Sequence, residues 1–238
     1  MNCSVFYQNV RGLRTKPAIF FNNVVLAYYD IISLSETWLN SSFASLDYFP
    51  PEYTVFRRDR DYEKLSVKFG GGVLTAVKKH LRANRRFDLE FEWESVWIEI
   101  PLRDNSSLLI GTFYFPPNVD GSKFSDQLDM LGDKLDVDQH RILILGDFNI
   151  PEINWHLVHP SLFAHSASFK ANALFSFVNL LGFTQTNGLH NSAGHVLDLA
   201  LANFPIDSLM SVSDPLVLPD VWHVPFSVSF MISQFKCM

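Results

Sequence analysis

Oxygen-bearing side chains recur in this sequence at points where a short apolar run ends. The run RILILG leads into Asp147 and Asn149, which are two residues apart and therefore point to the same side of an extended chain. Glu36 closes a second apolar run, and Asn9 closes the first. Each position alone is also typical of an ordinary turn. Together, their carboxylate and amide oxygens favour a site for Mg²⁺ or Mn²⁺ rather than zinc.

Asp198 is the most unusual carboxylate, because it interrupts the apolar run VLDLALA. In a strand it would lie mid-run, on the same face as Val196 and Ala200. A buried carboxylate is unfavourable unless a metal, a cation or several hydrogen-bond donors accompany it. The alternative is that Asp198 faces solvent, as most aspartates do.

His223 is the histidine whose neighbours are best suited to chemistry. It precedes a final apolar run, and Asp220 lies three residues earlier. At that separation Asp220 can orient the imidazole if the turn between them allows it. An oriented histidine can act as a base, or donate to a phosphoryl oxygen, near neutral pH.

Short apolar runs bounded by turn residues predict the strands that position these side chains. In residues 94–100, for example, Val96, Ile98 and Ile100 alternate with other residues, as in a strand with one buried face. The predicted strands cover residues 4–10, 29–36, 70–77, 94–100, 108–115, 141–147, 196–202 and 224–232.

Two segments carry apolar residues at helical spacing. Ser122 would cap the first helix, and Gly182 would end the second. Their apolar stripes are Phe124, Leu128, Leu131 and Leu135, and Ala171, Leu174, Phe175, Val178 and Leu181. A third helix is expected over about residues 16–27. Many strands with interspersed helices predict an α/β or α+β sandwich, in which helices cover sheet layers.

The composition is that of a chain with a substantial core. The 238 residues are 47% hydrophobic and 18% charged, and 25 acidic against 19 basic residues give a net charge of −6. These figures exclude a disordered tail, a collagen-like repeat and a polybasic nucleic-acid arm. The length, without an obvious linker, favours one domain over residues 1–238.

The sequence also limits where the protein is expected to act. No apolar stretch approaches the roughly 18 to 20 residues of a membrane helix. Cys3 and Cys237 lie at opposite ends, so a disulfide framework cannot be built from them. We therefore expect a soluble, intracellular protein that does not associate with membranes.

The order of these motifs resembles that of the endonuclease/exonuclease/phosphatase family, from about residue 4 to residue 231. The resemblance rests on Asn in QNVRG, Glu in SETW, Tyr in TFYFPP, GDFN, the strand Asp in LDLAL and a late His before Pro. Within the family, the sequence looks most like the N-terminal endonuclease domain of non-LTR (LINE-type) retrotransposon polyproteins. QNVRGLRTK, LSETWLNSS, YFPP and RRDR followed by GGGV carry that closer likeness.

The resemblance implies an α+β fold, a four-layer α/β/β/α sandwich with two packed, mostly antiparallel sheets. It also implies roles for the site residues. Glu36, helped by Asn9, would hold Mg²⁺, with Mn²⁺ as the alternative ion. Asp147 would position or deprotonate the attacking water, and Asn149 and Tyr114 would hold the phosphate. Asp198 would contact the leaving-group side, and His223 would polarise the phosphate.

Two features depart from the family pattern. The family normally has Asp directly before the late His, whereas Val221 and Trp222 separate Asp220 from His223. We expect Asp220 to reach the imidazole through a tightened turn; the alternatives are that Asp214 replaces it or that activity is low. His195 stands where the family often has Ser or Thr, which could alter a contact near the phosphate.

The resemblance makes some surface residues candidates for DNA contacts. Arg57, Arg58 and Arg60 cluster in what is expected to be a loop and could bind phosphates beside the cleavage point. An ordinary solvated charge run is the equal alternative. Asn187, followed by Gly, is a tight-turn signal, so residues 184–196 are a candidate hairpin beside the site. That segment could equally be a simple connection.

The resemblance finally implies a function. We expect a Mg²⁺-dependent hydrolase, a DNA endonuclease that nicks one strand of double-stranded DNA and leaves a 3′-hydroxyl for target-primed reverse transcription. A reverse transcriptase domain of the same polyprotein would be its partner. The isolated domain is expected to be monomeric, made in the cytoplasm and nuclear in action. The alternatives are an abasic-site or small-molecule phosphoesterase of the same fold, and a catalytically impaired relative that binds nucleic acid.

Overall fold

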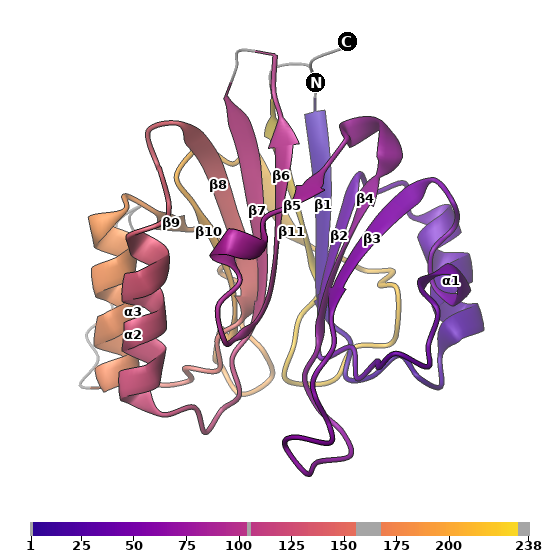
Figure 1. Cartoon of the computed structure of the whole chain (residues 1–238), viewed down its shortest axis with the longest axis horizontal. Helices are drawn as coiled ribbons and strands as arrows, with labels where there is room; N and C mark the ends of the chain where they lie inside the picture. The colour runs from indigo at the N-terminus through magenta and orange to yellow at the C-terminus, as the bar shows by residue number, and fades with distance from the viewer. Residues whose placement is uncertain (1, 104–105, 156–167, 233–238) are drawn as a thin grey trace.

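Two six-stranded sheets pack face to face in the computed structural model, and helices cover their outer faces (Figure 1). The structure describes residues 2–103, 106–155 and 168–232. Helix α1 (Pro17–Leu26) covers one sheet, while α2 (Gly121–Gly132) and α3 (Phe169–Leu180) lie side by side on the other. The expected four-layer α/β/β/α sandwich is therefore confirmed.

The first sheet has the strand order β11-β12-β1-β2-β4-β3. Its neighbours are antiparallel except for β1 and β2, which are parallel. The strands are β1 (Asn2–Asn9), β2 (Ile31–Ser35), β3 (Tyr53–Arg58), β4 (Val73–Lys78), β11 (Ser208–Ser211) and β12 (Phe226–Met231).

The second sheet has the order β5-β6-β7-β8-β10-β9. Only β7 and β8 are parallel among its pairs, so both sheets are mostly antiparallel, as expected. The strands are β5 (Asn84–Arg85), β6 (Glu94–Pro101), β7 (Ser107–Tyr114), β8 (His140–Asp147), β9 (Thr184–Gln185) and β10 (Asp198–Ala202). Short 3₁₀ turns occupy Ser45–Asp47, Lys79–Leu81 and Phe87–Leu89.

The prediction that Ser122 caps the helix now labelled α2 is wrong. Asp120 is the cap: its carboxylate accepts hydrogen bonds from the backbone N–H groups of Ser122 (3.0 Å) and Lys123 (3.1 Å). A carboxylate outside the helix can reach both free N–H groups, whereas Ser122 lies inside the first turn. Gly182 does follow α3 in the left-handed conformation expected of a helix stop, with φ +66°.

The buried face of α3 also differs from the predicted stripe. Ala171, Leu174 and Phe177 are buried, whereas Phe175 and Val178 are only partly covered. Because α2 lies beside α3 as well as the sheet below it, two neighbours rather than one decide which side chains of α3 are covered. The predicted stripe assumed that α3 packs against one surface only, and it therefore named the wrong buried residues in part.

Strand alternation decides which polar side chains point into the space between the sheets. On β8, Leu143 and Leu145 belong to the core between the sheets, while Ile142 and Ile144 pack under the helices. Asp147 has the parity of the inward residues, so its carboxylate points between the sheets. By the same alternation, Asn9 lies on the inward face of β1 with Tyr7, and Tyr114 lies on the inward face of β7 with Ile110.

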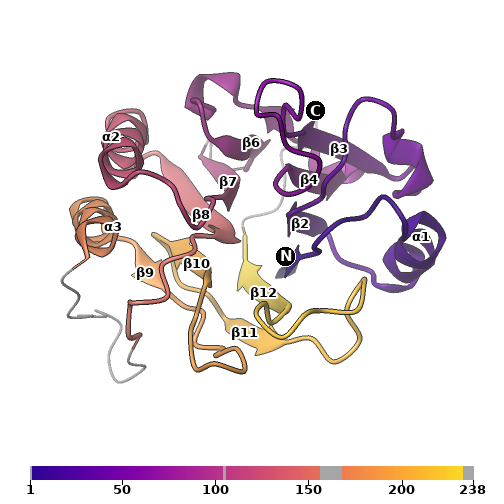
Figure 2. The same cartoon turned by 90° about the horizontal axis from the view of Figure 1, so that it is seen from below.

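These strand ends meet at one edge of the sandwich. In Figure 1 the chain begins at the top of β1, which therefore runs downward, and Figure 2 views the lower end, where the loops after β1, β2 and β8 gather. Asp198 is paired directly with Asp147 in the sheet register. Asp198 is the first residue of β10 rather than a mid-strand residue, and Val196 packs in the outer cluster under the helices. The predicted placement of Asp198 is corrected in this respect.

Within the described residues, no helix combines the length and the apolar character needed to cross a bilayer. Cys3 is buried in the core between the sheets, with its thiol pKa raised by that burial. Cys237 lies outside the described residues.

Candidate active site

A cleft of about 290 Å³ opens at the edge where the strand ends meet. Side chains from both sheets and from the loop before β12 line it, which brings together residues more than 200 positions apart. Seven of the residues singled out from the sequence line the cleft: Asn9, Glu36, Tyr114, Asp147, Asn149, Asp220 and His223. Asp198 lies directly beneath His223, to which it is hydrogen-bonded.

Asp147 is held at the floor of the cleft by neighbours on both sides. The Asn9 side-chain amide donates to its Oδ2 (3.0 Å), and the backbone N–H of Asn149 donates to its Oδ1 (3.1 Å). Asn149 itself has φ +50°, and its side-chain amide donates to the carbonyl of Phe115 (2.9 Å). The turn after β8 is thus fixed in an unusual conformation that keeps the Asp147 carboxylate in place.

His223 takes Asp198 as its carboxylate partner, not Asp220. The imidazole Nδ1 lies 2.8 Å from Asp198 Oδ2, while the other oxygen of Asp198 accepts a hydrogen bond from the Tyr7 hydroxyl (2.8 Å). With Nδ1–H donating to Asp198, Nε2 lies at the cleft, 3.3 Å from the side-chain amide nitrogen of Asn9 and 3.8 Å from Asp147 Oδ2. The expectation that Asp220 orients the ring is therefore wrong.

Asp220 stabilises the turn that carries His223. Its Oδ1 accepts from the backbone N–H groups of Trp222 (2.8 Å) and His223 (2.9 Å), and its Oδ2 pairs with Arg11 (2.9 Å). Both oxygens of Asp220 are thus taken by groups other than the imidazole nitrogens. Asp214, the alternative partner, lines a different cavity between α1 and β11.

The close carboxylates shift the acid–base properties of the site. Burial raises the pKa of Asp147 well above its usual range, and repulsion by Asp198 adds to the rise. For His223, burial lowers the pKa, but the charge and hydrogen bond of Asp198 outweigh it and raise the pKa to about 10. This shift favours the imidazolium, in which Nε2–H would be a donor at the cleft.

Glu36 is presented by a strained turn directly after β2. Its φ is +57°, and its Oε2 accepts hydrogen bonds from the Trp38 indole N–H and from the backbone N–H of Gly71 (3.1 Å). The Tyr114 hydroxyl is hydrogen-bonded to the same carboxylate, and burial followed by the charge of Glu36 raises the Tyr114 pKa. Tyr114 therefore stays protonated as a donor at the cleft.

The donor set fits a hard divalent cation. Glu36 and Asp147 repel each other electrostatically, and Asn9 lines the same cleft at the end of β1, where its amide oxygen accepts from the backbone N–H of Arg11 (3.2 Å). A cation held by Glu36 with Asn9 would offset this repulsion, and oxygen ligands of this kind suit Mg²⁺. Asp147, Asp198 and His223 also bring one ligand atom each within 4.8 Å of one another. Because both oxygens of Asp198 already accept protein hydrogen bonds, we assign this trio to the His–Asp pair rather than to the metal.

The arginines expected to bind DNA are mostly engaged within the protein. Arg57 and Arg58 close β3 instead of lying in a loop. Arg57 pairs with Asp59 and donates to the carbonyl of Phe43 (2.6 Å), which ties the loop after β2 to the sheet. Its predicted role as a free phosphate contact is not supported by this placement. Arg58 is half-buried, and burial lowers its pKa; it lines a separate cavity with Lys64.

Arg60 braces the site instead of facing solvent. It pairs with Glu94 (2.5 Å), and its guanidinium lies over the Tyr114 ring, 5.3 Å from the centroid. Glu94 in turn accepts from the backbone N–H of Gly72 (2.6 Å). A Cβ at Gly71, which has φ +68°, would collide with the side chains of this ion pair. The glycine turn and the ion pair therefore fix each other and, through Gly71, the carboxylate of Glu36.

Asn187 is buried rather than exposed on a hairpin. It is 2% exposed, its side-chain amide donates to the backbone carbonyl of Asp198 (2.6 Å), and its Oδ1 accepts from the N–H of Leu189 (3.0 Å). The expectation that Asn187 contacts DNA is corrected: it supports the first residue of β10. His195, which stands where the resemblance predicts Ser or Thr, lies in the same segment between β9 and β10. Its backbone N–H donates to Asn191 Oδ1 (3.0 Å).

The sequence analysis missed Tyr7, Arg11, Trp38 and Glu94 as parts of the site. Tyr7 is the clearest omission, because its buried hydroxyl joins the two sheets by bonding Ser35 and Asp198. Its position two residues before Asn9 was the available signal, since both side chains point to the same face of β1.

The sequence of residues 7–215 matches the endonuclease/exonuclease/phosphatase family. The family resemblance noted from the motifs is thereby confirmed, although the matched segment ends before Asp220 and His223. No curated protein matches the sequence.

Several solved structures share the fold. The endonuclease domain of TRAS1, described as a telomere-specific non-LTR retrotransposon, has a TM-score of 0.70 at 15% identity and covers 99% of this chain and 100% of its own. The AP endonuclease LMAP from Leishmania major has a TM-score of 0.70 at 14% identity, covering 96% and 87%. The human Nocturnin catalytic domain has 0.66 at 12% identity, covering 98% and 94%. At these identities the likeness shows the fold alone.

Proposed function

The chain belongs to the endonuclease/exonuclease/phosphatase family, whose members are metal-dependent hydrolases of phosphodiester bonds, and we propose that this one is a Mg²⁺-dependent endonuclease that nicks one strand of double-stranded DNA. The observation that carries the proposal is the pair of groups at the cleft floor. Asp147 is fixed by Asn9 and Asn149, and it faces an imidazolium that Asp198 holds in place. The Asp147 carboxylate can accept a proton from water, and the His223 imidazolium can donate a hydrogen bond to a phosphoryl oxygen.

In this mechanism Asp147 positions the attacking water and accepts its proton. A carboxylate whose pKa is raised by burial is a stronger base than an exposed one, which suits this task. The water attacks phosphorus in line with the leaving oxygen, and negative charge grows on the phosphoryl oxygens. His223 Nε2–H donates to one of these oxygens.

The remaining donors orient the phosphate. Tyr114 presents its hydroxyl from the end of β7, and Asn149 follows Asp147 at the end of β8. Asp198 acts through His223, by holding its tautomer and favouring the imidazolium. Bound at Glu36 with Asn9, Mg²⁺ would supply Lewis-acid stabilisation of the developing charge.

We further propose that the 3′-hydroxyl left by the nick primes reverse transcription in retrotransposition, with a reverse transcriptase domain of the same polyprotein as partner. The motif likeness to LINE-type endonucleases and the fold shared with the TRAS1 endonuclease domain support this proposal. Action in the nucleus and a monomeric state of the isolated domain belong to the same proposal. An abasic-site endonuclease is the second candidate, supported by the equal structural similarity to LMAP.

The test is cleavage of intact supercoiled plasmid by the purified protein in Mg²⁺. We expect conversion to open circles, no conversion in EDTA, and nicks that a DNA polymerase extends without prior treatment, which requires a 3′-hydroxyl. Partly depurinated plasmid is the matched substrate for the second candidate. Cleavage confined to depurinated plasmid would favour the abasic-site reading, and ends that cannot be extended would contradict the priming role.

A further inference from the structure

Trp222 exposes a large indole at the rim of the active-site cleft. Its side chain is 46% exposed and lines the same cleft as Asp147 and His223. Tryptophan is usually highly buried on average, so an exposed one directly beside a catalytic candidate needs an explanation. Val221 and Trp222 are also the two residues that separate Asp220 from His223.

The backbone under Trp222 is firmly held, so the exposure does not come from a loose loop. The Trp222 N–H donates to Asp220 Oδ1 (2.8 Å), and the Trp222 carbonyl accepts from the Asn191 side-chain amide (3.1 Å). The Val221 carbonyl accepts from the Ser192 hydroxyl (3.0 Å) and more weakly from its backbone N–H (3.3 Å). Two loops are thus joined beneath the indole, which makes a pre-organised support for it.

Trp38, whose indole also lines the cleft, is already engaged in contacts within the protein. The Trp38 ring nitrogen donates to Glu36, and its ring contacts Phe69 with centroids 5.7 Å apart. In the part of the chain that the structure describes, no hydrogen bond or ring contact holds the Trp222 indole. Only Trp222 of these two therefore has a face available for a ligand.

We propose that Trp222 stacks on one nucleobase of the cleaved strand, next to the phosphate that is hydrolysed. This inference rests on the proposed function. His223, the next residue, faces the phosphate, so the nucleoside attached to that phosphate is the part of the substrate closest to the indole. Arg11, which pairs with Asp220, also lines the cleft with 54% of its side chain exposed and could contact a phosphate of the strand. Base–aromatic stacking is tolerant of base identity because every base offers a π-face.

Stacking on Trp222 would influence where the protein cleaves. A base inside a duplex is covered by its neighbours, so it must leave the stack before it reaches Trp222. Nicking is then favoured beside steps that unstack readily, such as TA and CA/TG. Trp222 would contribute to site preference through deformability of the DNA rather than through hydrogen bonds to base edges.

The test combines protein variants with single-base deletions in the substrate. Duplex oligonucleotides carry one tetrahydrofuran residue, which lacks a base, at successive positions around a mapped nick, and kcat/KM is measured for each. With the complete duplex, Trp222→Ala is expected to lower kcat/KM on the order of 10- to 100-fold. Trp222→Phe, which keeps a stacking ring, is expected to retain most of the rate.

The effect of Trp222→Ala should depend on the removal of a base at one position of the duplex only. Removing the base there is expected to slow the wild-type protein by a similar factor and to leave Trp222→Ala unaffected, because the contact is already absent. Leu218→Ala, in the same loop but outside the cleft and 89% exposed, is the matched control and should match wild type on every duplex.

The outcomes separate this inference from the proposed function. If Trp222→Ala cleaves the complete duplex as fast as wild type, or loses the same factor at every position, stacking is wrong although the nuclease assignment stands. If the wild-type protein cleaves no DNA while it hydrolyses bis(p-nitrophenyl) phosphate, the proposed function fails, and the inference fails with it.

Discussion

Replacing Asp147 by asparagine is expected to lower the rate of Mg²⁺-dependent plasmid nicking by about 1,000-fold. The substitution keeps the size of the side chain but removes the proton acceptor, and general base catalysis typically contributes 10²- to 10⁴-fold. The rate constant for conversion of supercoiled to open-circular plasmid, with enzyme in excess over plasmid, measures the effect. A variant that kept more than a tenth of the wild-type rate would contradict the role of Asp147.

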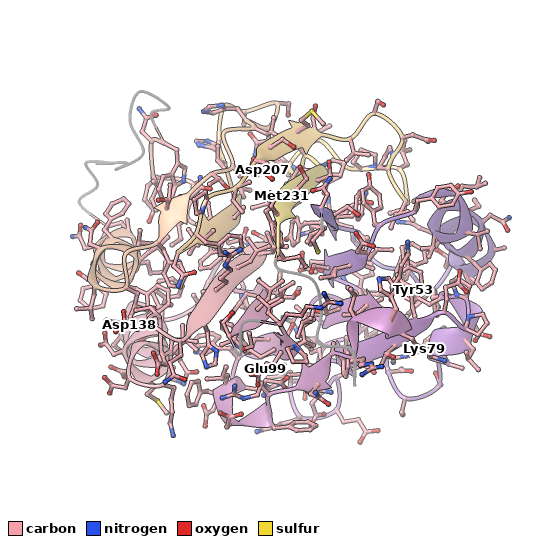
Figure 3. The ribbon with its side chains drawn as sticks, turned by 90° about the horizontal axis from the view of Figure 1, so that it is seen from above. Tyr53, Lys79, Glu99, Asp138, Asp207 and Met231 are labelled. Carbon is pink, nitrogen blue, oxygen red and sulfur yellow. The ribbon has the colours of Figure 1, made fainter. Side chains whose placement is uncertain are left out.

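The fold of this variant can be checked independently. Burial and the nearby Asp198 raise the pKa of Asp147, so a negative charge on this side chain destabilises the metal-free fold. Removing the charge should leave the melting temperature of the metal-free protein unchanged or higher. Asp138→Asn is the matched control, since Asp138 is exposed at the opposite end of the sandwich (Figure 3) and should nick normally.

Replacing His223 by alanine is expected to slow nicking on the order of 100- to 1,000-fold, because one donor to the developing charge is lost. Asp198→Asn should be deleterious as well, since it removes the carboxylate that orients the ring and stabilises its protonated form. The two residues act as a unit, so the double variant should be little slower than His223→Ala alone. His190→Ala, at an exposed residue, is the control.

The pH profile distinguishes the imidazolium from a neutral base. The pKa of His223 is raised to about 10, mainly by Asp198 against the opposing effect of burial, so the protonated donor persists until the pH approaches that value. Without the Asp198 charge, burial remains and the pKa falls. The alkaline limb of the wild-type profile should therefore lie at high pH and move to lower pH in Asp198→Asn. An alkaline limb at the same pH in both proteins would contradict the pairing.

The same shift has a consequence for stability. Because the folded pKa of His223 lies above the unfolded value, its stabilising contribution is fully present below about pH 6.5. That contribution is lost as the pH rises from there through about 10.

The positions of the main strands and the identities of the strand-end residues could be predicted from the sequence. Asn9, Glu36, Tyr114 and Asp147 follow strongly apolar runs, and strand parity alone places three of them on inward faces. All eight predicted strands are present. The runs of β5, β9 and β11 are too short for periodicity to identify, and β3 was missed because YTVFRR ends in two arginines.

The contacts between distant segments could not be predicted in the same way. His223 contacts Asp198 rather than Asp220 because the packing of the two sheets brings β10 and the loop before β12 together. Spacing along the chain can suggest partners only among residues that are close in sequence. Arg60 likewise appeared to be a surface charge until its partner Glu94, 34 residues later, was located. Asn187 was a good turn residue in sequence, but its amide serves the backbone of Asp198.

The net charge of −6 does not oppose DNA binding at this site. Several acidic residues surround the cleft, where a bound cation would offset their charge, and Arg11 remains exposed beside them. Arg11, Arg57 and Arg60 are all engaged in ion pairs in the described part of the chain, and we expect binding to intact DNA that is weak and sensitive to salt.

We propose that oxygen ligands from separate strands converge on one divalent cation at the edge of the two sheets. The most direct measurement is the position of Mn²⁺ in crystals of the protein, located by anomalous scattering. We expect a single strong peak in the cleft, coordinated by the Glu36 carboxylate and bordered by Asn9 and Asp147. A peak at the Asp198–His223 pair, or an empty cleft at saturating Mn²⁺, would contradict it.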